Sequence, residues 1–417
     1  MAQTGFEEMM KMRVTISPSK AKGTVLAPPS KSMAHRMLIG AGLSKGESVV
    51  KNIELSEDIK ATLGILEALG ATYEIEGRTV KIRGIGERGV VATKSLDSKE
   101  SGSTLRFFIP ILLAGGNKAE FYGAKRLFER PLEIYEKICE KQEIFFQKKE
   151  DGLIVEGQLQ PSYFRIEGNI SSQFITGLLY ALPMLDGNSV LEIIPPVESR
   201  AYIDMTIQAL QMFGIKIEQK ENAFCISGNQ SYQATNVTVE GDYSNAAFLD
   251  AFNLIDGDVT VDGLLEQSLQ GDKIYREYFK RLKEGAPTLD LSDCPDLGPI
   301  LMGIAAICNG AHFTGTRRLR IKESDRGAVM AEELAKFGIG VSVDEDDIVV
   351  YKGTIKRPSE TLDSHNDHRI AMTLATLCSV TGGSINGAEA VRKSFPTYYD
   401  VIERIGIVVS REDETEV

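Results

Sequence analysis

Apolar residues recur at helical spacing in six segments of the chain, and each segment is followed by short stretches that read as strands. Apolar residues three and four positions apart share one face of a helix, so each segment predicts an amphipathic helix. The residue that follows each predicted helix recurs at steps of 72, 72, 71, 53 and 68 residues. Such spacing indicates a repeated structural unit. The six positions are Gly70, Gln142, Gly214, Gly285, Gly338 and Gly406.

Six further segments are apolar on nearly every side and open near Ser, Asp, Asn, Pro or Gly. This pattern is typical of a capped helix that is buried all round. Such a helix offers free N–H groups and the positive end of its dipole at its N-terminus alone. The segments span residues 28–43, 101–115, 171–184, 242–255, 294–308 and 366–380.

The two kinds of segment alternate, so each unit contains one buried helix, one amphipathic helix and several short strands. The step between buried helices shortens once, from about 71 to about 52 residues, which makes the second half less regular. A chain of 417 residues is also long for a single core. We therefore predict an α/β fold with two similar lobes, each holding three buried helices walled by sheets and outer helices. If the lobes face each other, several helix N-termini meet at one cleft and form an anion site.

Composition narrows the possible partners. The formal net charge of -12 argues against a general nucleic-acid or anionic-membrane binder, because either needs a broad basic surface. Five scattered cysteines without a C-x-x-C pair argue against a disulfide framework or a zinc site and fit a reducing cytosol. The sequence has no run of 18 apolar residues and no secretory signal pattern at its start. We expect a cytoplasmic monomer that binds no nucleic acid, membrane or metal.

Polar residues collect where the predicted helices begin. Cations there oppose the helix dipole at a cost of a few tenths to about 1 kcal/mol each, which an anionic ligand would offset. Asp296 and Glu323 lie among them, and we interpret these carboxylates as proton-transfer groups. The positions are Lys31, Ser32, Arg36, Ser103, Arg106, Ser171, Ser172, Gln173, Asp296, Asp367, His368 and Arg369 on buried helices, and Lys125, Arg126, Arg130, Ser199, Arg200, Tyr202, residues 321–326, Lys393 and Ser394 before outer helices.

Each position also has a structural interpretation: serines that cap helices, a solvated charge cluster, a surface histidine or solvated cations. Polar residues placed independently would not recur at the same point of each repeated unit. Their recurrence at the helix starts therefore favours a shared site. Cys294, beside Asp296, is interpreted as an inert buried thiol rather than a nucleophile. The alternatives concern Ser32, Ser171 and Ser199 for capping, residues 321–326 for the charge cluster, His368 for the histidine, and Arg130 and Lys393 for the solvated cations.

Six motifs occur along the chain in the order PPSKSMAHR (28–36), ERP (129–131), SSQF (171–174), IKESDR (321–326), NDHRIAM (366–372) and KSFP (393–396). In this order they resemble the motifs of the 5-enolpyruvylshikimate-3-phosphate synthase family, the 3-phosphoshikimate 1-carboxyvinyltransferases. The resemblance extends from about Val14 to about Arg404. It implies two lobes of three βαβαββ units around a cleft that closes on substrate. One lobe is expected at residues 1–28 plus 241–417, and the other at residues 29–240.

The resemblance also implies a reaction: the enolpyruvyl group of phosphoenolpyruvate moves to the 5-hydroxyl of shikimate 3-phosphate through a tetrahedral intermediate, and phosphate is released. No cofactor is required. We assign Glu323 to proton transfer at the methylene carbon and Asp296 to proton transfer at the hydroxyl, with Lys31 and Lys393 as electrostatic or acid partners. Burial on closure is expected to raise the pKa of Glu323 against the cations beside it.

Binding residues for the two substrates follow from the same resemblance. Those implied for shikimate 3-phosphate are Lys31, Ser32, Arg36, Ser171, Ser172, Gln173, Ser199, Tyr202, Asp296 and Lys322. Those implied for phosphoenolpyruvate are Lys31, Gly102, Arg130, Gln173, Arg326, Arg369 and Lys393.

Residues 100–103 read Glu-Ser-Gly-Ser where the family often has Asn-Ala-Gly-Thr or Asn-Ser-Gly-Thr, and Arg318 stands where some members use an amide. Glu100 and Arg318 are therefore left out of the predicted site. Gly102 implies sensitivity to the inhibitor glyphosate.

Two alternative functions stay open at this point. A related enolpyruvyl transferase acts on UDP-N-acetylglucosamine, but the PPSKS segment and the helical setting of Cys139 disfavour it. A catalytically silent anion-binding protein of the same fold is the second alternative.

Overall fold

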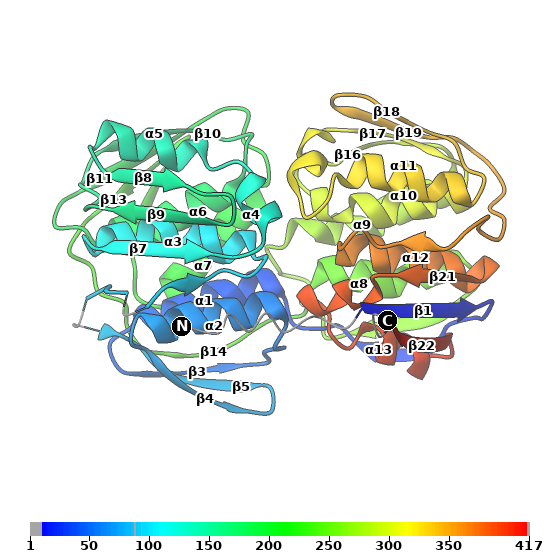
Figure 1. Cartoon of the computed structure of the whole chain (residues 1–417), viewed down its shortest axis with the longest axis horizontal. Helices are drawn as coiled ribbons and strands as arrows, with labels where there is room; N and C mark the ends of the chain where they lie inside the picture. The colour runs from blue at the N-terminus through cyan, green and yellow to red at the C-terminus, as the bar shows by residue number, and fades with distance from the viewer. Residues whose placement is uncertain (1–10, 87–88, 93, 415–417) are drawn as a thin grey trace.

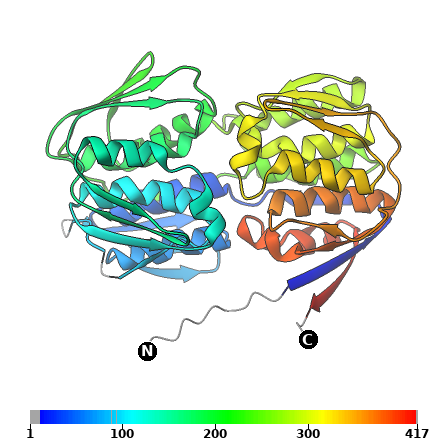
Figure 2. The same ribbon diagram turned by 45° about the horizontal axis from the view of Figure 1, so that its top comes forward.

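The structure, a computed structural model, describes residues 11–86, 89–92 and 94–414. Two α/β lobes lie side by side and stay distinct when the molecule is turned (Figures 1 and 2). Each lobe has its own hydrophobic core. Residues between 33 and 239 form the core of what we call the mid-chain lobe. Residues between 12 and 27 and between 243 and 407 form the core of the terminal lobe.

Two chain segments connect the lobes, and they run beside each other. The backbone N–H of Ser30 donates to the carbonyl of Glu240, and the N–H of Asp242 donates to the carbonyl of Pro28, both at 2.8 Å. A bridge between Pro29 and Gly241 completes the contact. The chain therefore passes between the lobes at one short, hydrogen-bonded crossing.

Six helices with an all-round apolar character lie inside the lobes, one in each segment that the sequence predicted. In α1 every side chain from Met33 to Leu43 is buried, which is why its sequence has no polar face. Ser30 caps α1 by accepting a hydrogen bond from the backbone N–H of Met33 at 3.4 Å. These helices are α1 (Lys31–Leu43), α3 (Gly102–Ala114), α6 (Ser172–Ala181), α8 (Tyr243–Asp250), α10 (Gly298–Ile307) and α12 (His368–Thr381).

The amphipathic helices pack with one face toward the cores. In α9 the buried residues are Tyr275, Phe279 and Leu282, spaced four and three apart, while charged side chains occupy every other position except Tyr278. Figure 1 shows α11 on the outside of the terminal lobe beside α10. The set comprises α2 (Glu57–Ala68), α5 (Glu133–Lys141), α7 (Arg200–Met212), α9 (Tyr275–Glu284), α11 (Arg326–Lys336) and α13 (Tyr398–Arg404), with a short α4 (Lys125–Glu129) before α5.

Three units complete their own four-stranded sheet. Each places its strands in the order first, second, fourth, third; the first two are parallel, and the later pairs are antiparallel. The sheets consist of β6 (Leu96–Asp97), β7 (Lys118–Tyr122), β9 (Gly152–Glu156) and β8 (Phe145–Lys148); β10 (Tyr163–Glu167), β11 (Ser189–Ile194), β13 (Ala223–Ile226) and β12 (Ile217–Lys220); and β16 (Thr288–Asp290), β17 (Ala311–Thr314), β19 (Asp347–Val350) and β18 (Val341–Val343).

Two more units keep the same strand order but borrow a strand from a distant part of the chain. The first strand of the α1 unit is β14 (Asn236–Thr238), which pairs with β3 (Glu47–Lys51), followed by β5 (Thr79–Arg83) and β4 (Thr72–Glu76). In the α12 unit, β1 (Lys11–Ser17) lies between β21 (Gly383–Asn386) and β22 (Val408–Glu414), with β20 (Leu362–Asp363) at the edge. Each lobe is therefore closed by a long-range strand pairing.

The unit built on α8 and α9 is shorter than the other five. Its sheet holds β15 (Asp258–Asp262) parallel to β2 (Lys22–Leu26), and the next strand after α9, β16, already belongs to the following unit. Two strands that close the other units are missing from this fully described stretch. Their absence explains why the sequence step falls to 53 residues here. The βαβαββ pattern expected of this unit is thus truncated to βαβα.

No helix within the described ranges is long and apolar enough to span a membrane. The start of the chain, residues 1–10, where the sequence was searched for a secretory signal, lies outside the described residues.

A proline inside α3 creates a local constraint between the buried helices. Pro110 has no N–H, so the carbonyl of Arg106 lacks its usual helical partner. The hydroxyl of Tyr135 replaces it by donating to the Arg106 carbonyl at 2.7 Å. Gly177 of α6 packs against this spot: a Cβ there would lie 2.4 Å from the Tyr135 hydroxyl and 2.5 Å from the Arg106 carbonyl oxygen. Glycine is therefore required for this close helix packing.

We predict that Gly177→Ala destabilises the mid-chain lobe by about 1 to 3 kcal/mol, because the new methyl group must displace backbone and a satisfied hydrogen bond. Urea unfolding followed by circular dichroism measures this. Gly64→Ala is the matched control, since Gly64 lies in helix α2 with open space around its Cβ position, and it should be neutral or stabilising by about 0.5 to 1 kcal/mol. Equal unfolding midpoints for Gly177→Ala and the parent protein would contradict the packing argument.

Candidate active site

Two adjoining cavities lie where the buried helices begin. The larger, of about 80 Å³, lies between the lobes, with walls from the starts of α1, α3 and α6 and from terminal-lobe residues between 296 and 323. The smaller, of about 20 Å³, is lined by Asp242 at the start of α8, Asp296 just before α10 and Arg369 at the start of α12. All six buried helices therefore contribute residues at or near their N-termini. The cavities share Lys31, Ser32, Tyr202 and Asp296.

Arg326 is the most enclosed cation described at this site, with a side chain only 1% exposed. Its guanidinium donates to three carboxylates: Nη1 to Asp296 at 2.7 Å, Nη2 to Glu323 at 2.9 Å and Nε to Asp367 at 2.8 Å. Asp367 is itself fully buried and caps α12 by accepting the backbone N–H of Arg369 at 2.9 Å. The charges that begin α11 are thus turned inward, and the alternative of a solvated surface cluster is wrong.

Cations from three segments surround Asp296. Besides Arg326, Lys322 Nζ lies 3.2 Å and Arg369 Nη2 lies 3.8 Å from its carboxylate oxygens. Burial alone would raise the pKa of Asp296, but Lys322, Arg369 and Arg326 outweigh it and hold that pKa well below its usual range. Asp296 is therefore a carboxylate at neutral pH.

Glu323 shows the same balance of effects. Burial raises its pKa, but nearby cations, led by Arg326 and Arg130, hold the pKa well below the usual glutamate range. The expectation that burial makes Glu323 a ready proton donor is wrong for this arrangement, because the ion pairs are stronger than the effect of burial. The neighbouring Lys322 behaves oppositely: burial lowers the pKa of its ammonium to about 8 despite the attraction of Asp296.

Arg130 extends from the mid-chain lobe toward the other lobe. Its Nε donates to the carbonyl of Ile321 at 3.1 Å, and its side chain is buried. Gly102 makes room for it, since a Cβ on Gly102 would lie 2.7 Å from Arg130 Nη1. Glycine at the start of α3 is therefore explained by steric space: it lets the Arg130 guanidinium lie against the N-terminus of this helix.

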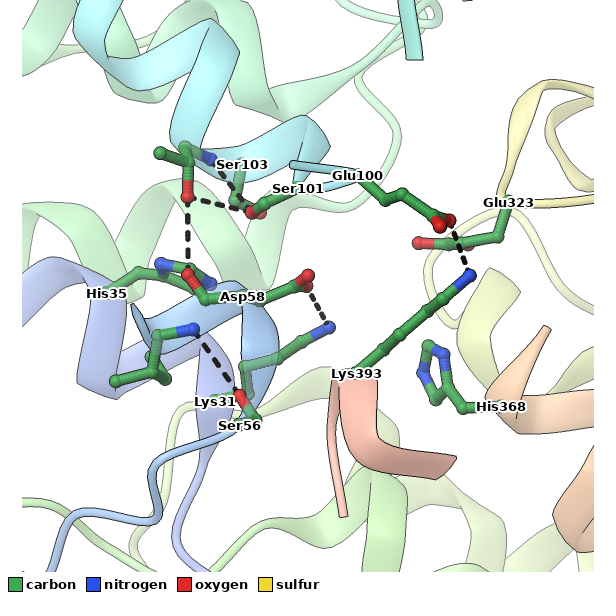
Figure 3. A network of polar contacts seen from close by, with 12 residues as sticks. Lys31, His35, Ser56, Asp58, Glu100, Ser101, Ser103, Glu323, His368 and Lys393 are labelled. Atoms are coloured by element: carbon green, nitrogen blue, oxygen red, sulfur yellow. Dashed lines mark hydrogen bonds and ion pairs between the residues drawn. The ribbon is translucent and has the colours of Figure 1, made fainter. Parts of the chain in front are cut away.

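Among the described lining residues, the wall from the mid-chain lobe is polar and basic apart from Asp58. Gln173 joins two helices by accepting from Arg106 Nη1 at 2.7 Å and donating to Ser103 Oγ at 3.0 Å. Lys31 Nζ donates to Asp58 at 2.7 Å, as Figure 3 shows. This wall presents hydroxyl groups, an amide and cations, the groups that bind phosphate and carboxylate oxygens.

Arg36 is buried against the same wall. It donates to the hydroxyl of Thr206 at 2.9 Å and to the backbone carbonyls of Ser32 and Tyr202 at 2.7 and 3.0 Å. Burial lowers the pKa of its guanidinium to about 10. Its described partners are thus neutral oxygens, so a bound anion would supply the missing counter-charge.

Of the sixteen residues predicted for the site, twelve line the larger cavity, which brings together groups spread over nearly 300 residues of sequence. Arg326 and Arg369 do not line this cavity but contact Asp296, which does. Ser199 accepts a hydrogen bond from Arg318 at 2.6 Å, and Lys393 contacts Glu100 and Asn366. The twelve are Lys31, Ser32, Arg36, Gly102, Arg130, Ser171, Ser172, Gln173, Tyr202, Asp296, Lys322 and Glu323.

The structure tests the alternative interpretations of these residues as helix caps, solvated side chains or an inert thiol. Ser171 does cap α6, accepting from the backbone N–H of Gln173 at 3.3 Å, but Ser32 is not a cap because Ser30 holds that position. Ser199 is at the cap position of α7 without a side-chain cap bond. The solvated alternatives are wrong, since Arg130, His368 and Lys393 are buried. Cys294 is 2% exposed, and burial raises the pKa of its thiol, as expected of an inert cysteine.

Several residues of the site were not assigned to a substrate or to catalysis from the sequence. Asp58 pairs with Lys31, Arg106 holds Gln173, and Arg318, set aside because it departs from the family pattern, lines the larger cavity. The sequence did indicate Arg106 as a candidate, because it lies near the start of a buried helix. No such indication existed for Asp272: it follows a loop, and only the fold brings it to Tyr202, whose hydroxyl donates to it at 3.1 Å.

The repeated units, the two cores and a charged cavity at the helix N-termini define a two-lobed α/β enzyme class with an anion-binding cleft. A family profile described as EPSP synthase (3-phosphoshikimate 1-carboxyvinyltransferase) matches residues 16–402. The chain belongs to this family. It is accordingly a transferase of the shikimate pathway, which leads to the aromatic amino acids.

Relatives and solved structures agree with this assignment. A 3-phosphoshikimate 1-carboxyvinyltransferase of Clostridium novyi (strain NT) is 39% identical over 427 residues, covering 95% of this chain and 98% of the relative. The enzyme of the same name from Clostridium acetobutylicum is 39% identical over 416 residues, covering 94% and 97%. The EPSP synthase structure from Acinetobacter baumannii superposes with a TM-score of 0.77 at 23% identity, covering 96% and 100%, and confirms the fold predicted from the sequence. The family match disfavours the UDP-sugar alternative.

We predict that Asp272→Asn stabilises the protein increasingly as pH rises. Burial and the charge of Asp296 raise the pKa of Asp272 to about 7, whereas the unfolded side chain titrates near 3.8. Between these values the unfolded state releases its proton while the folded state keeps it, so Asp272 costs stability as pH rises through this window. The variant lacks this cost, and its advantage should grow by about 2 to 3 kcal/mol between pH 5 and pH 8.

Thermal unfolding at both pH values measures the effect. Asp258→Asn is the control, because that aspartate is exposed. A stability difference between Asp272→Asn and the parent that stays constant with pH would contradict the argument.

Proposed function

We propose that the chain transfers the enolpyruvyl group of phosphoenolpyruvate to the 5-hydroxyl of shikimate 3-phosphate and releases inorganic phosphate. Family membership supports the reaction. The observation that carries the proposal at residue level is the inter-lobe cavity, where Asp296 and Glu323 lie among buried cations. Such an arrangement suits a reaction that joins two anions and moves protons between them.

Electrostatic repulsion is the first barrier to this reaction. Two like unit charges 4 Å apart repel by about 4 kcal/mol at an effective dielectric of 20. Six cations and several helix N-termini around the cavity offset that repulsion. The cations are Lys31, Arg36, Arg130, Lys322 and Arg369, which line the two cavities, and Arg326, which contacts the lining residue Asp296.

Shikimate 3-phosphate binds along the mid-chain lobe and reaches Asp296 and Lys322, whereas phosphoenolpyruvate binds against Gly102, Arg130 and the Arg326 cluster. These two positions put the acceptor hydroxyl and the enol carbon face to face. The first set is Lys31, Ser32, Arg36, Ser171, Ser172, Gln173, Ser199, Tyr202, Asp296 and Lys322, and the second is Lys31, Gly102, Arg130, Gln173, Arg326, Arg369 and Lys393.

The chemistry is an addition followed by an elimination. Asp296 accepts the proton of the 5-hydroxyl as its oxygen bonds to C2 of phosphoenolpyruvate, and Glu323 delivers a proton to the methylene carbon, C3. The resulting tetrahedral intermediate then loses a proton from C3 to Glu323 as the bond from C2 to the phosphate oxygen breaks. The proton held by Asp296 passes to the leaving phosphate, so both carboxylates return to their starting states. Protons and electron pairs balance without a cofactor, and phosphate leaves with the bonding electrons.

Substrate binding raises the low pKa values of the two carboxyl groups. Each substrate anion that engages Arg326, Arg130 or Lys322 competes with Glu323 and Asp296 for that cation. A weaker hold by the cations leaves burial as the larger effect, and burial raises the pKa of a carboxyl group. The carboxyl groups become competent for proton transfer only in the loaded site.

We also propose the lobe boundaries at residues 1–28 plus 241–417 and 29–240, which the two separate cores support. A cytoplasmic location and a monomeric state complete the proposal. Unpaired cysteines fit the location, and size-exclusion chromatography with light scattering tests the monomer.

A phosphate-release assay distinguishes the proposed function from its alternatives. Phosphate should appear only when both shikimate 3-phosphate and phosphoenolpyruvate are present. Release with UDP-N-acetylglucosamine as acceptor would support the other enolpyruvyl transferase. No release with either acceptor would support a silent anion-binding protein.

We predict that Glu323→Gln and Asp296→Asn each lower kcat about 100-fold or more while the Kd for shikimate 3-phosphate changes little, because each removes a proton-transfer group. Steady-state kinetics and calorimetry measure the two quantities. Glu332→Gln, an exposed neighbour on α11, should leave both unchanged. A variant with the parent kcat would remove that residue from the mechanism.

Arg130→Ala should weaken the binding of phosphoenolpyruvate more than 100-fold and the binding of shikimate 3-phosphate far less. The reason is that loss of a buried partner charge costs about 3 to 5 kcal/mol of binding free energy. KM values for both substrates measure the split. Arg126→Ala, on the short helix α4 that Arg130 follows, is the control, since Arg126 is 46% exposed. Equal weakening of both substrates would reject the assignment of Arg130 to phosphoenolpyruvate.

A further inference from the structure

Glu100 connects the two lobes beside the cavity. Its Oε2 accepts a hydrogen bond from Lys393 Nζ at 2.5 Å, and Asn366 Nδ2 lies 3.1 and 3.2 Å from its two carboxylate oxygens. Lys393 Nζ also donates to the backbone carbonyl of Asn366 at 2.5 Å. Figure 3 shows Lys393 extended toward Glu100. Glu100 belongs to the mid-chain lobe and Lys393 to the terminal lobe, so the contact spans the interface.

A tight turn fixes where Glu100 points. Lys99 has a positive φ of 48°, and its N–H donates to Asp97 Oδ1 at 2.8 Å. The N–H of Ser101 donates to the carbonyl of Ser98 at 2.9 Å, and the N–H of Ala124 donates to the carbonyl of Lys99 at 2.8 Å. These bonds hold the backbone on both sides of Glu100. Its carboxylate is therefore presented to the other lobe by a fixed backbone rather than by a loose loop.

The contact determines what Lys393 can reach. Lys393 is not among the described residues that line the larger cavity, although Gly102, two residues after Glu100, is. The Lys393 side chain is 8% exposed and that of Glu100 is 27% exposed, so the pair is only partly screened by water. Glu100 thus supplies the anion that neutralises this cation at the edge of the cavity.

We propose that Glu100 competes with phosphoenolpyruvate for Lys393 and so sets the affinity of the enzyme for that substrate. The inference rests on the proposed function, in which Lys393 binds phosphoenolpyruvate. When this substrate enters, its anionic oxygens replace the Glu100 carboxylate as partner of Lys393, and the nearby Glu100 charge repels them. Shikimate 3-phosphate does not share Lys393, so its binding is independent of Glu100. Glu100 is a residue that tunes affinity rather than a catalytic residue.

The test is the KM for each substrate in Glu100→Gln, which keeps the side-chain size and removes the charge. The KM for phosphoenolpyruvate should fall about fivefold, the effect of one partly exposed charge pair, while the KM for shikimate 3-phosphate stays constant. Inorganic phosphate should also inhibit more strongly when tested against phosphoenolpyruvate. Glu54→Gln is the matched control: Glu54 also crosses the lobe interface, accepting from Thr397 Oγ1 at 3.0 Å, and should leave both KM values unchanged.

Other outcomes overturn the inference. An unchanged or higher KM for phosphoenolpyruvate in Glu100→Gln does so, and so does an equal fall in Glu54→Gln, which would indicate a general effect on lobe closure. Lys393→Met separates the inference from the proposed function. If Lys393→Met raises the KM for phosphoenolpyruvate while Glu100→Gln leaves it unchanged, the proposed function stands and the competition between Glu100 and phosphoenolpyruvate is rejected. If Lys393→Met leaves that KM unchanged, the assignment of Lys393 fails and the inference falls with it.

Discussion

The site depends on keeping one buried guanidinium, that of Arg326, neutralised where the two lobes meet. Removing an ion from water costs several kcal/mol, and three carboxylates from different segments offset that cost here. Because Arg326 begins α11 and Asp367 caps α12, the contacts that neutralise the charge also fix the starts of two helices. Asp296 and Glu323 are therefore positioned by folding itself, before any substrate arrives, which is the preorganisation that electrostatic catalysis requires.

The two lobes use the same repeated unit for different chemical tasks. In the mid-chain lobe the buried helices begin with hydroxyl, amide and glycine positions, which suit the binding of anionic oxygens. In the terminal lobe acidic residues occupy the comparable positions, namely Asp242, Asp296 and Asp367, and the last two pair with Arg326. A repeat that points every buried helix N-terminus at one region allows this division, because each lobe can change its first turn without changing its core.

Much of this arrangement could be predicted from the sequence, because periodicity reports directly on burial. The six buried helices and most cavity residues follow from all-round apolar segments with polar starts. The truncated α8–α9 unit left a trace as a short step, but the step alone did not say which strands were missing. The borrowed strands β1 and β14 carry no local signal, since pairing over hundreds of residues is a property of the closed fold. The pKa of Glu323 was mispredicted because ion-pair strength depends on distances that sequence does not contain. Asp272 was missed for the same reason.

The most direct test of the central claim is a crystal structure of the protein with shikimate 3-phosphate bound. The account predicts that the phosphate lies at the start of α6 beside Ser171 and Ser172, and that the 5-hydroxyl lies about 2.6 to 3.2 Å from the carboxylate of Asp296. A ligand seated outside the inter-lobe cavity, or one whose 5-hydroxyl faces away from Asp296, would contradict it.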